Sequence, residues 1–450
     1  MSVTEDRLQR MRPRPRRGPA IDVAALPPGP RSHAIVQSIG LLGFRHRFVP
    51  AMRRRYGDAF TLDVLPEGRH LVVFERPEVL KEIFAGDPEV FHAGKGNAIL
   101  GPVMGEHSLL LVDGATHQRA RKLLMPAFNG HALRGYADVV TGLAKTEVGS
   151  WTPGRPFRSL DRMNALTLEV ILQVVFGVTD EHRLAELRPL VNQTVNISPL
   201  VFLGWGLSGL HRYGPWRRTY ENQQELDRVI YAEIAERRRA PDLAERGDVL
   251  SRLLLVEDEG ERLGDDELRD QLVTLLLAGH ETTATALSWS LYELGRDPGH
   301  LARAREAALG GDDDHLEAVL KEAMRLHPVI PMVVRHLMAP ARVGGYDLPA
   351  GVTVAASILL AHSDPRNFPL PLVFDPSRFE HGRIPPNTWL PFGGGVRRCI
   401  GAGFSLMEGV AVLREVLTTW DLEAVGDDEP KVRNITSVPR HGARIAVAPR

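Results

Sequence analysis

The chain contains a single cysteine, Cys399, and the residues around it favour metal chemistry over simple packing. It lies in the stretch FGGGVRRCIG, residues 392–401, which has four glycines. Glycines allow backbone conformations that other residues avoid, and they let a backbone approach a flat macrocycle closely. A thiolate there would be a buried anionic ligand for iron, stabilised by backbone N–H groups. A lone cysteine is more often a small buried apolar residue, but this loop favours the ligand.

Two neighbouring features support a thiolate at this position. A helix expected from about Phe404 would direct its positive end toward the sulfur of Cys399. The guanidinium of Arg397 suits the carboxylates of a macrocycle. A cysteine nucleophile would need a base nearby, and neither Arg397 nor Arg398 can serve as one near neutral pH. One cysteine also excludes an internal disulfide, a Cys-rich zinc site and an iron–sulfur cluster held by several thiolates.

The overall composition is that of an ordinary globular protein. The 450 residues are 43% hydrophobic and 25% charged, with a formal net charge of −1, which does not favour nucleic acid as a partner. No apolar run is long enough to span a bilayer, and the first 20 residues are polar and basic, unlike a signal peptide. The sequence therefore predicts a cytoplasmic protein without a transmembrane segment.

The elements that would position Cys399 are mostly helices. An acidic start at residues 265–267 and a stop at Asp297-Pro298 predict a central helix of about 30 residues, or roughly 45 Å. FTLDV and HLVVF read as strands around a turn, and GVTVAAS reads as a later strand. The prediction is a mainly α fold of the α+β class. Residues 1–25 would form a flexible basic and proline-rich tail. Residues 26–450 would form one domain, with β-rich parts at about 55–80 and 333–360 and a helical core at about 80–330.

The cysteine loop matches the signature Phe-Gly-x-Gly-x-Arg-x-Cys-x-Gly at every fixed position, so the chain resembles the cytochrome P450 family. The resemblance implies a large helical domain, with a long central helix over a haem, and a smaller β-rich region. It implies haem b with Cys399 as the axial thiolate. Within the loop, the residues that would bind this cofactor are Phe392, Gly393, Arg397 and Gly401.

The resemblance also assigns roles on the central helix, which reads AGHETT over residues 278–283. A small residue at Ala278 would let the helix pass close to the haem. Thr282 would hold a water or the bound dioxygen, and Glu281 would supply protons from solvent. Without the resemblance, the motif also fits a surface glutamate followed by two ordinary mid-helix threonines.

Further motifs match the family outside the central helix. Glu322 and Arg325 are spaced i, i+3 and share one helix face. By resemblance, Arg378 in FDPSRF joins them in a structural triad that locks the cysteine loop against the core. The resemblance also implies that propionate partners include His117, Arg121 and Arg335. Taken singly, each of these three also fits a solvated surface residue.

The activity implied is insertion of one oxygen atom from O2 into a C–H bond by hydroxylation, with epoxidation as the alternative. The chain has no flavin or dinucleotide motif, so electrons would come from a separate ferredoxin and its reductase. Three cations are candidates for the docking of that partner, namely Arg119, Lys122 and Arg398. The alternatives are a peroxide-using or isomerase/dehydratase-type enzyme of the same fold, and a non-catalytic haem sensor or carrier.

The substrate is expected to be a hydrophobic small molecule, such as a terpenoid, steroid, fatty acid or polyketide, and the protein is expected to be a monomer. The family pattern places a largely apolar pocket wall at Leu275, Ile330, Met332, Val333 and Thr436. The apolar segment 196–216 falls where the family has a mobile lid. It also fits a membrane or partner contact, or ordinary core packing.

Overall fold

The computed structural model describes residues 25–66, 68–197, 201, 208–380 and 384–450. The predicted tail up to residue 24, and residues 198–200 and 202–207 of the apolar segment, lie outside this description. The chain divides into two compact units. Among the described residues, unit 1 comprises 97–143 and 164–281, and unit 2 comprises 25–96, 144–163 and 282–450.

Unit 1 is built from helices, and three long helices have residues in both units. Short 3-10 turns η2 (Ala98–Leu100), η3 (Met125–Phe128) and η4 (Ser208–Arg212) connect some of them. The helices confined to unit 1 are α6 (Gly101–Met104), α7 (Gly114–Leu124), α10 (Glu181–Val195), α12 (Gly214–Arg239) and α13 (Val249–Leu255). The helices that have residues in both units are α8 (Gly130–Gly149), α9 (Ser159–Phe176) and α14 (Asp265–Arg296).

Helix α14 has the bounds that its sequence predicts. Three acidic residues occupy its first turn, where they complement the positive end of the helix. The helix ends before Asp297, whose carboxylate accepts hydrogen bonds from the backbone N–H groups of Gly299 and His300. Asp297 therefore caps the following helix, and Pro298 occupies that helix's first position. The boundary between the two units falls inside α14, after Glu281.

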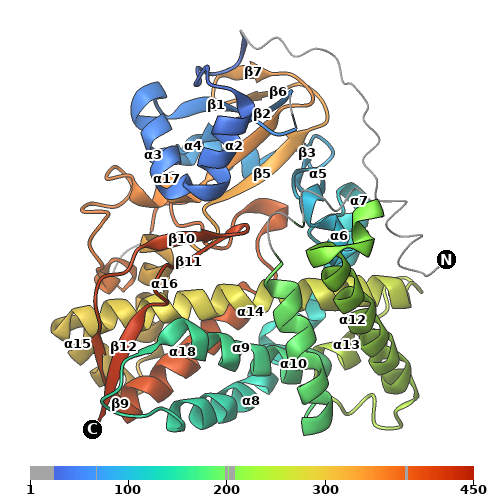
Figure 1. The fold of residues 1–450 in the computed structure, drawn as a ribbon, viewed down its shortest axis with the longest axis vertical. Helices are drawn as coiled ribbons and strands as arrows, with labels where there is room; N and C mark the ends of the chain where they lie inside the picture. Colours follow the sequence, from blue (N-terminus) through green and yellow to red (C-terminus); the bar gives the residue numbers. More distant parts are fainter. Residues whose placement is uncertain (1–24, 67, 198–200, 202–207, 381–383) are drawn as a thin grey trace. The chain divides into compact units, whose positions relative to one another are not determined.

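Unit 2 contains a five-stranded sheet in the order β1-β2-β8-β5-β3. Strands β2 and β8 are parallel, whereas the other neighbouring pairs are antiparallel. In Figure 1, α2, α3 and α17 lie beside this sheet. The strands are β1 (Ala59–Val64), β2 (Arg69–Phe74), β3 (Phe91–His92), β5 (Met332–Leu337) and β8 (Thr353–Ser357). Strands β1, β2 and β8 lie where the sequence predicts them.

The two faces of this sheet pack into separate apolar cores. One core includes Phe74, Phe84 and Val333, and the other includes Phe60 and Met332. Successive side chains of a strand point to opposite faces, so this separation follows from the period of two along β5.

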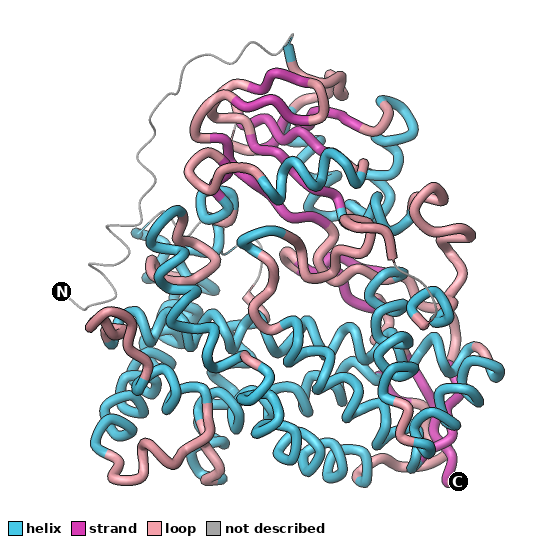
Figure 2. Tube along the Cα trace, turned by 180° about the vertical axis from the view of Figure 1, so that it is seen from behind, coloured by secondary structure: helices cyan, strands magenta, loops and turns pink. Residues whose placement is uncertain are grey.

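The remaining strands of unit 2 form smaller sheets. Strands β9 to β12 lie outside the β-rich regions that the sequence predicts. Figure 2 shows β9 and β12 beside the carboxyl terminus. The three-stranded sheet is β4 (Phe157–Arg158), β12 (Arg444–Pro449) and β9 (Trp420–Ala424), and the two-stranded sheets are β10 (Pro430–Arg433) with β11 (Thr436–Pro439) and β6 (Ala341–Val343) with β7 (Tyr346–Leu348).

The helices of unit 2 surround these sheets and carry the cysteine loop. The first five are α2 (Ala34–Gly43), α3 (Arg45–Tyr56), α4 (Pro77–Ala85), α5 (Ala93–Gly96) and α15 (Pro298–Gly310). They are followed by α16 (Asp313–Leu326), α17 (Ile358–Ser363), η5 (Pro376–Phe379), η6 (Gly395–Arg397) and α18 (Ala402–Thr419).

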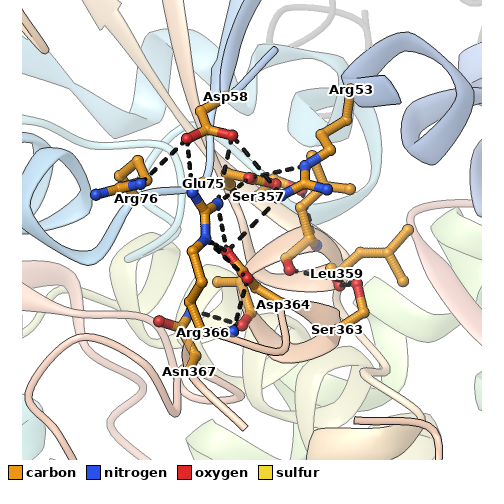
Figure 3. Close-up of polar contacts among 12 residues, drawn as sticks. Arg53, Asp58, Glu75, Arg76, Ser357, Leu359, Ser363, Asp364, Arg366 and Asn367 are labelled. Carbon is orange, nitrogen blue, oxygen red and sulfur yellow. Dashed lines mark hydrogen bonds and ion pairs between the residues drawn. The ribbon is translucent and has the colours of Figure 1, made fainter. Parts of the chain in front are cut away.

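A charged network joins α3, the β1–β2 hairpin and the turn after α17 (Figure 3). The guanidinium of Arg366 lies 3.0 Å from a carboxylate oxygen of Asp58 and 2.9 Å from one of Glu75. Arg53 donates a second hydrogen bond of 2.9 Å to Glu75. Glu75 and Asp364 are nearly inaccessible to solvent, so their charges need these partners. The network therefore ties the turn after α17 to α3 and the β1–β2 hairpin, which lie about 300 residues earlier in the chain.

Among the described residues, no single helix is both long and apolar enough to cross a membrane. Helices α9 and α10 meet that test only as a pair, and they are bent by 116° relative to each other.

Candidate active site

The cysteine loop is a tight turn that ends at the N-terminus of α18. The N–H of Cys399 donates to the carbonyl oxygen of Phe392 at 2.9 Å, which closes the loop. Gly393 and Gly395 have φ values of 66° and 64°, in the left-handed region that favours glycine. The side chain of Cys399 is exposed, and α18 starts three residues later, at Ala402. The thiol therefore lies next to the positive end of a helix, which favours its anionic form.

The glycines of the loop pack directly on Phe84 of α4. A Cβ atom on Gly395 would lie 1.9 Å from the backbone oxygen of Phe84, and one on Gly394 would lie 2.6 Å from its ring. No larger residue fits at either position without a shift of the backbone or the ring. The guanidinium of Arg335 lies over the same ring, 6.0 Å from its centroid. Phe84 thus connects the cysteine loop with one of the predicted propionate partners.

The three residues of the predicted structural triad meet in unit 2. Arg325 donates two hydrogen bonds of 2.7 Å to the carboxylate of Glu322, and Arg378 donates one of 3.3 Å. Glu322 and Arg325 are fully buried. Arg325 also donates to the backbone oxygens of His362, Pro371 and Val373, at 3.1, 2.7 and 3.1 Å. The triad therefore fixes two segments of backbone as well as its own charges.

A buried histidine connects the triad with the approach to the cysteine loop. His362 Nε2 accepts the N–H of Leu390 at 2.8 Å, and its Nδ1 lies 3.2 Å from the carbonyl oxygen of Arg325. The Leu390 carbonyl accepts the N–H of Gly393 at 2.9 Å. Burial, followed by the charge of Arg325, lowers the pKa of His362 to about 3, so the ring is neutral. With Nε2 as acceptor, Nδ1 must carry the proton and donate to Arg325.

One face of α14 is less buried than the rest of the helix. Ala278 is exposed and Leu275 and Thr282 are partly exposed, whereas Glu281 is buried. Residues 275, 278 and 282 are spaced i, i+3 and i+7, so they lie on one side of the helix. This face combines two apolar side chains with one hydroxyl.

A polar contact joins α14 to the helix that follows Cys399. The hydroxyls of Thr283 and Ser405 lie 3.1 Å apart. Glu408, one turn further along α18, is fully buried, and neither of its carboxyl oxygens has a hydrogen-bond partner within the described part of the chain. Burial raises the pKa of Glu408 to about 8, whereas the nearby Thr283 hydroxyl acts in the opposite direction. Glu408 is therefore a buried carboxyl group that is mostly protonated near neutral pH.

In unit 1, α9 packs tightly against α14 just before Glu281. The hydroxyl of Thr167 donates to the carbonyl oxygen of His280 at 3.0 Å and lies 3.1 Å from its Nδ1. A Cβ atom on Gly279 would meet the side chain of Ile171 at 2.6 Å. Gly279 is therefore required for this close approach of two helices.

The other predicted residues of unit 1 lie on α7. His117 is buried and Arg121 is partly buried, one turn apart on the same helix face. Of the predicted docking cations, Arg119 pairs with Glu261 at 2.5 Å and with Glu267 at 2.7 Å. Lys122 pairs with Asp258 at 2.7 Å.

The third docking cation, Arg398, lies in unit 2 and is exposed. Over the described ranges it forms no ion pair. Of the three candidates, Arg398 therefore presents the charge that is not offset by a neighbouring carboxylate.

The predicted pocket residues of unit 2 do not share one surface. Val333 packs with the Phe84 core, together with Ile330, whereas Met332 packs with the opposite core around Phe60. Thr436 is buried, and its hydroxyl donates to the backbone oxygen of Arg433 at 2.7 Å. Val333 is the member of this set that lies beside the cysteine loop, because a Cβ atom on Gly393 would lie 4.0 Å from it.

These residues fit a haem with a thiolate ligand. The exposed thiol of Cys399 is a soft donor that suits iron. The positive-φ glycines beside it bring the backbone close to any group bound there. Arg335 lies over the Phe84 ring, and Arg397 lies in the loop itself; their guanidinium groups suit carboxylates such as propionates.

Comparison with known proteins establishes the family of this chain. The family model for cytochrome P450 matches residues 27–446. The chain therefore belongs to the cytochrome P450 family, and it is a monooxygenase of the oxidoreductase class. Family membership implies a haem-thiolate iron cofactor, O2, a redox partner and a small-molecule substrate.

Two mycobacterial relatives are similar over nearly the whole chain. Cytochrome P450 135A1 of Mycobacterium tuberculosis is 53% identical over 428 residues, covering 94% of this chain and 95% of that protein. Cytochrome P450 135B1 of the same species is 43% identical over 431 residues, covering 94% and 91%. The solved structure of cyanobacterial CYP120A1 with retinoic acid bound has a TM-score of 0.82 at 23% identity, covering 94% of this chain and 99% of that one. This likeness confirms the predicted fold class.

Sequence reasoning did not single out Phe84, His362, Glu408 or Thr167. A phenylalanine on an amphipathic helix carries no signal of its contact with a glycine loop. A histidine in LLAHSD likewise gives no sign that it joins Arg325 to Leu390. Each of these roles depends on a partner far away in sequence, which a local pattern cannot indicate.

Proposed function

We propose that this protein is a haem-thiolate monooxygenase in which Cys399 is the axial ligand of haem b, and that it oxidises C–H bonds of a hydrophobic small molecule. The observation that carries the proposal is the geometry of the cysteine loop. Its exposed thiol follows two left-handed glycines and precedes the positive end of α18. When bound, the haem supplies oxygen activation and removal of hydrogen from a C–H bond.

The residues proposed to bind the cofactor lie in the cysteine loop, on β5 and on α7. Phe392, Gly393 and Gly401 shape the loop. We propose that the haem propionates are bound by Arg335 and Arg397 of unit 2 and by His117 and Arg121 of α7. The Phe84 contact supports a role for Arg335, because it holds this guanidinium beside the loop glycines.

The proton chemistry is proposed to depend on α14. The Thr282 hydroxyl is on the less buried face of the helix, beside Ala278, where it can hold a water molecule by a hydrogen bond. Glu281 is the neighbouring carboxylate, and it would transfer protons from solvent toward that water. Two adjacent residues thus have separate roles in the proposal: the Thr282 hydroxyl holds the water, and the Glu281 carboxylate supplies the protons.

The substrate is proposed to be apolar. The side chains that support this proposal are Leu275 and Ala278 on the less buried face of α14, and Val333 beside the loop. The structural neighbour CYP120A1 has retinoic acid bound, an apolar molecule with one carboxylate. Electrons are proposed to come from a separate ferredoxin, since the chain carries no flavin or dinucleotide motif.

The proposal is tested by the difference spectrum of the reduced protein with carbon monoxide. A Soret band at the far-red position of thiolate-ligated haem is the expected result. The Cys399→Ser variant should retain a haem-binding fold but give no such band. If the wild-type protein binds haem and yields the band typical of histidine ligation, Cys399 is not the ligand.

A further inference from the structure

Helix α2 is amphipathic, but its polar side is buried against the protein and its apolar side is exposed. Its buried side chains are polar, Gln37 and Ser38, at 0% and 6% exposure. Ile35, Val36, Ile39 and Leu42 are 48%, 57%, 56% and 56% exposed, and Phe44 at the end of the helix is 62% exposed. We call these five side chains the α2 apolar face. Contiguous exposed apolar groups of this kind usually mark a contact surface.

Hydrogen bonds fix this orientation. The side-chain amide of Gln37 donates to the backbone oxygens of Pro30 and Ser32, at 3.2 and 2.7 Å. Its oxygen accepts the N–H of Asp63 at 2.8 Å, and the hydroxyl of Ser38 accepts the N–H of Leu65 at 2.9 Å. Rotating the helix to bury its apolar side would leave these groups without partners, which costs free energy for each one. The apolar face is therefore held outward.

The apolar area continues beyond the helix. Leu65, in the β1–β2 turn that bonds to Ser38, is 42% exposed. Ile435 is 44% exposed, and its carbonyl oxygen accepts a 3.1 Å hydrogen bond from Arg45, which directly follows Phe44. Two further exposed apolar side chains of unit 2 therefore belong to segments that are hydrogen-bonded to α2 and to the start of α3.

The surroundings of this face are positively charged. Residues 31–57 contain six arginines and no acidic residue. Of these, Arg47 pairs with Glu429 and Arg53 pairs with Glu75, and Arg45 is buried. Arg31, Arg54 and Arg55 are exposed, as is Arg69 at the start of β2.

An apolar face surrounded by arginines matches the surface of a membrane that contains anionic lipids. We propose that α2 lies in the headgroup region of such a membrane, with its apolar face inserted and the arginines bound to anionic headgroups. A second copy of this chain fits less well, because a symmetric contact would bring arginines against arginines. This inference does not depend on the proposed substrate or on the haem ligand.

The test is co-sedimentation of the full-length holoenzyme with vesicles. We expect binding to vesicles of phosphatidylcholine with phosphatidylglycerol, and much weaker binding to phosphatidylcholine alone. The variant with Ile35→Ser, Ile39→Ser and Leu42→Ser should lose at least about tenfold in its partition coefficient. The matched control is Leu370→Ser with Leu372→Ser, which removes two leucines that are 73% and 80% exposed elsewhere on unit 2. It should bind like the wild type.

Several outcomes would overturn the proposal. Wild-type protein that stays in solution with anionic vesicles would do so, as would equal losses for the α2 variant and the control. Light scattering tests the alternative that a second copy of this chain covers the face. If the wild type is a dimer that does not bind vesicles, and the α2 substitutions convert it to a monomer, the face is a self-interface. An unchanged carbon monoxide spectrum confirms that each variant is folded.

Discussion

His362 makes hydrogen bonds with both ends of the connection between the triad and the cysteine loop. It contacts the carbonyl oxygen of Arg325 and the N–H of Leu390, and both groups are buried. Removing its ring leaves two backbone groups unsatisfied, and each such group costs about 1–3 kcal/mol. The stability of the loop that holds Cys399 should therefore depend on a residue with no predicted role in the sequence.

The variant His362→Phe is expected to lower the free energy of unfolding by about 2 kcal/mol or more, because it keeps the ring volume but removes both hydrogen bonds. It should also increase the fraction of reduced protein whose carbon monoxide band lacks the thiolate position. Urea unfolding and the difference spectrum measure the two effects. His70→Phe, which removes a bond to Asp63 in the β1–β2 hairpin, is the control and should leave the spectrum unchanged. A normal spectrum for His362→Phe would contradict this role.

Glu408 gives a prediction for pH. Its pKa is raised from 4.5 to about 8 by burial, so folding keeps the group protonated. Its favourable contribution is complete below pH 4.5 and is lost as the pH rises through about 8. Glu408→Gln removes this dependence, so its stability relative to the wild type should increase from pH 6 to pH 9. Chemical unfolding at these two pH values measures it. Glu415→Gln on the same helix is the control, and identical slopes for both variants would disprove the assignment.

The family resemblance gives Thr282 the role of holding a water or the bound dioxygen. Thr282→Ala removes the hydroxyl that we propose to hold water on α14, so electron use should be uncoupled from product formation and peroxide should be released. The ratio of product to reduced nicotinamide consumed measures coupling. Thr285→Ala, three residues along the same helix and buried, provides the comparison. Coupling that is unchanged in Thr282→Ala would argue against this role.

At the scale of elements, the charged network of Figure 3 fixes α3 and the turn after α17 to the β1–β2 hairpin. Arg366 contacts three carboxylates, two of which are buried. Its own side chain is 44% exposed, so the contribution is smaller than that of a fully buried pair.

Arg366→Leu is expected to lower the free energy of unfolding by about 2 kcal/mol, because it leaves buried carboxylates with fewer partners. The control is Arg76→Leu, which removes an exposed arginine paired with Asp58 in the same network and should cost less than about 1 kcal/mol. Urea unfolding of both variants compares the two. Equal costs would mean that burial of the carboxylates does not determine the effect.

The elements differ in how far the sequence predicts them. Helix α14 was predictable with its bounds, because acidic residues at one end and Asp297-Pro298 at the other are local signals. Strands β10 and β11 were not, since each has four residues and depends on its partner. The same distinction holds in the site. The pattern around Cys399 is contiguous in sequence, whereas the contact of Phe84 with Gly394 and Gly395 spans about 300 residues of chain.

At the scale of the whole molecule, fewer cations are available to a redox partner than the sequence suggests. Arg119 and Lys122 are paired with carboxylates of unit 1, so reversing them would disrupt internal ion pairs. Arg398 is exposed beside Cys399. A docking test should therefore concentrate on Arg398.

Arg398→Glu is expected to slow the first reduction by ferredoxin roughly tenfold at low ionic strength, and less so at high salt, because charge steering is screened. Stopped-flow absorbance measures the rate. Arg342→Glu, an exposed arginine in the β6–β7 hairpin, is the control and should reduce at the wild-type rate. An Arg398→Glu rate that does not respond to salt and equals the control would exclude this cation from docking.

The single cysteine also has a practical consequence for labelling. Because the chain has one cysteine, any thiol alkylation of the folded protein by a maleimide or iodoacetamide must occur at Cys399. If iron occupies that sulfur, labelling should be blocked in the holoenzyme and stoichiometric in the haem-free protein. The fraction of protein that is not alkylated, measured by mass spectrometry, would then equal the fraction that carries the cofactor. A fluorophore directed to a second, introduced cysteine would avoid Cys399 only if every molecule in the preparation carries haem.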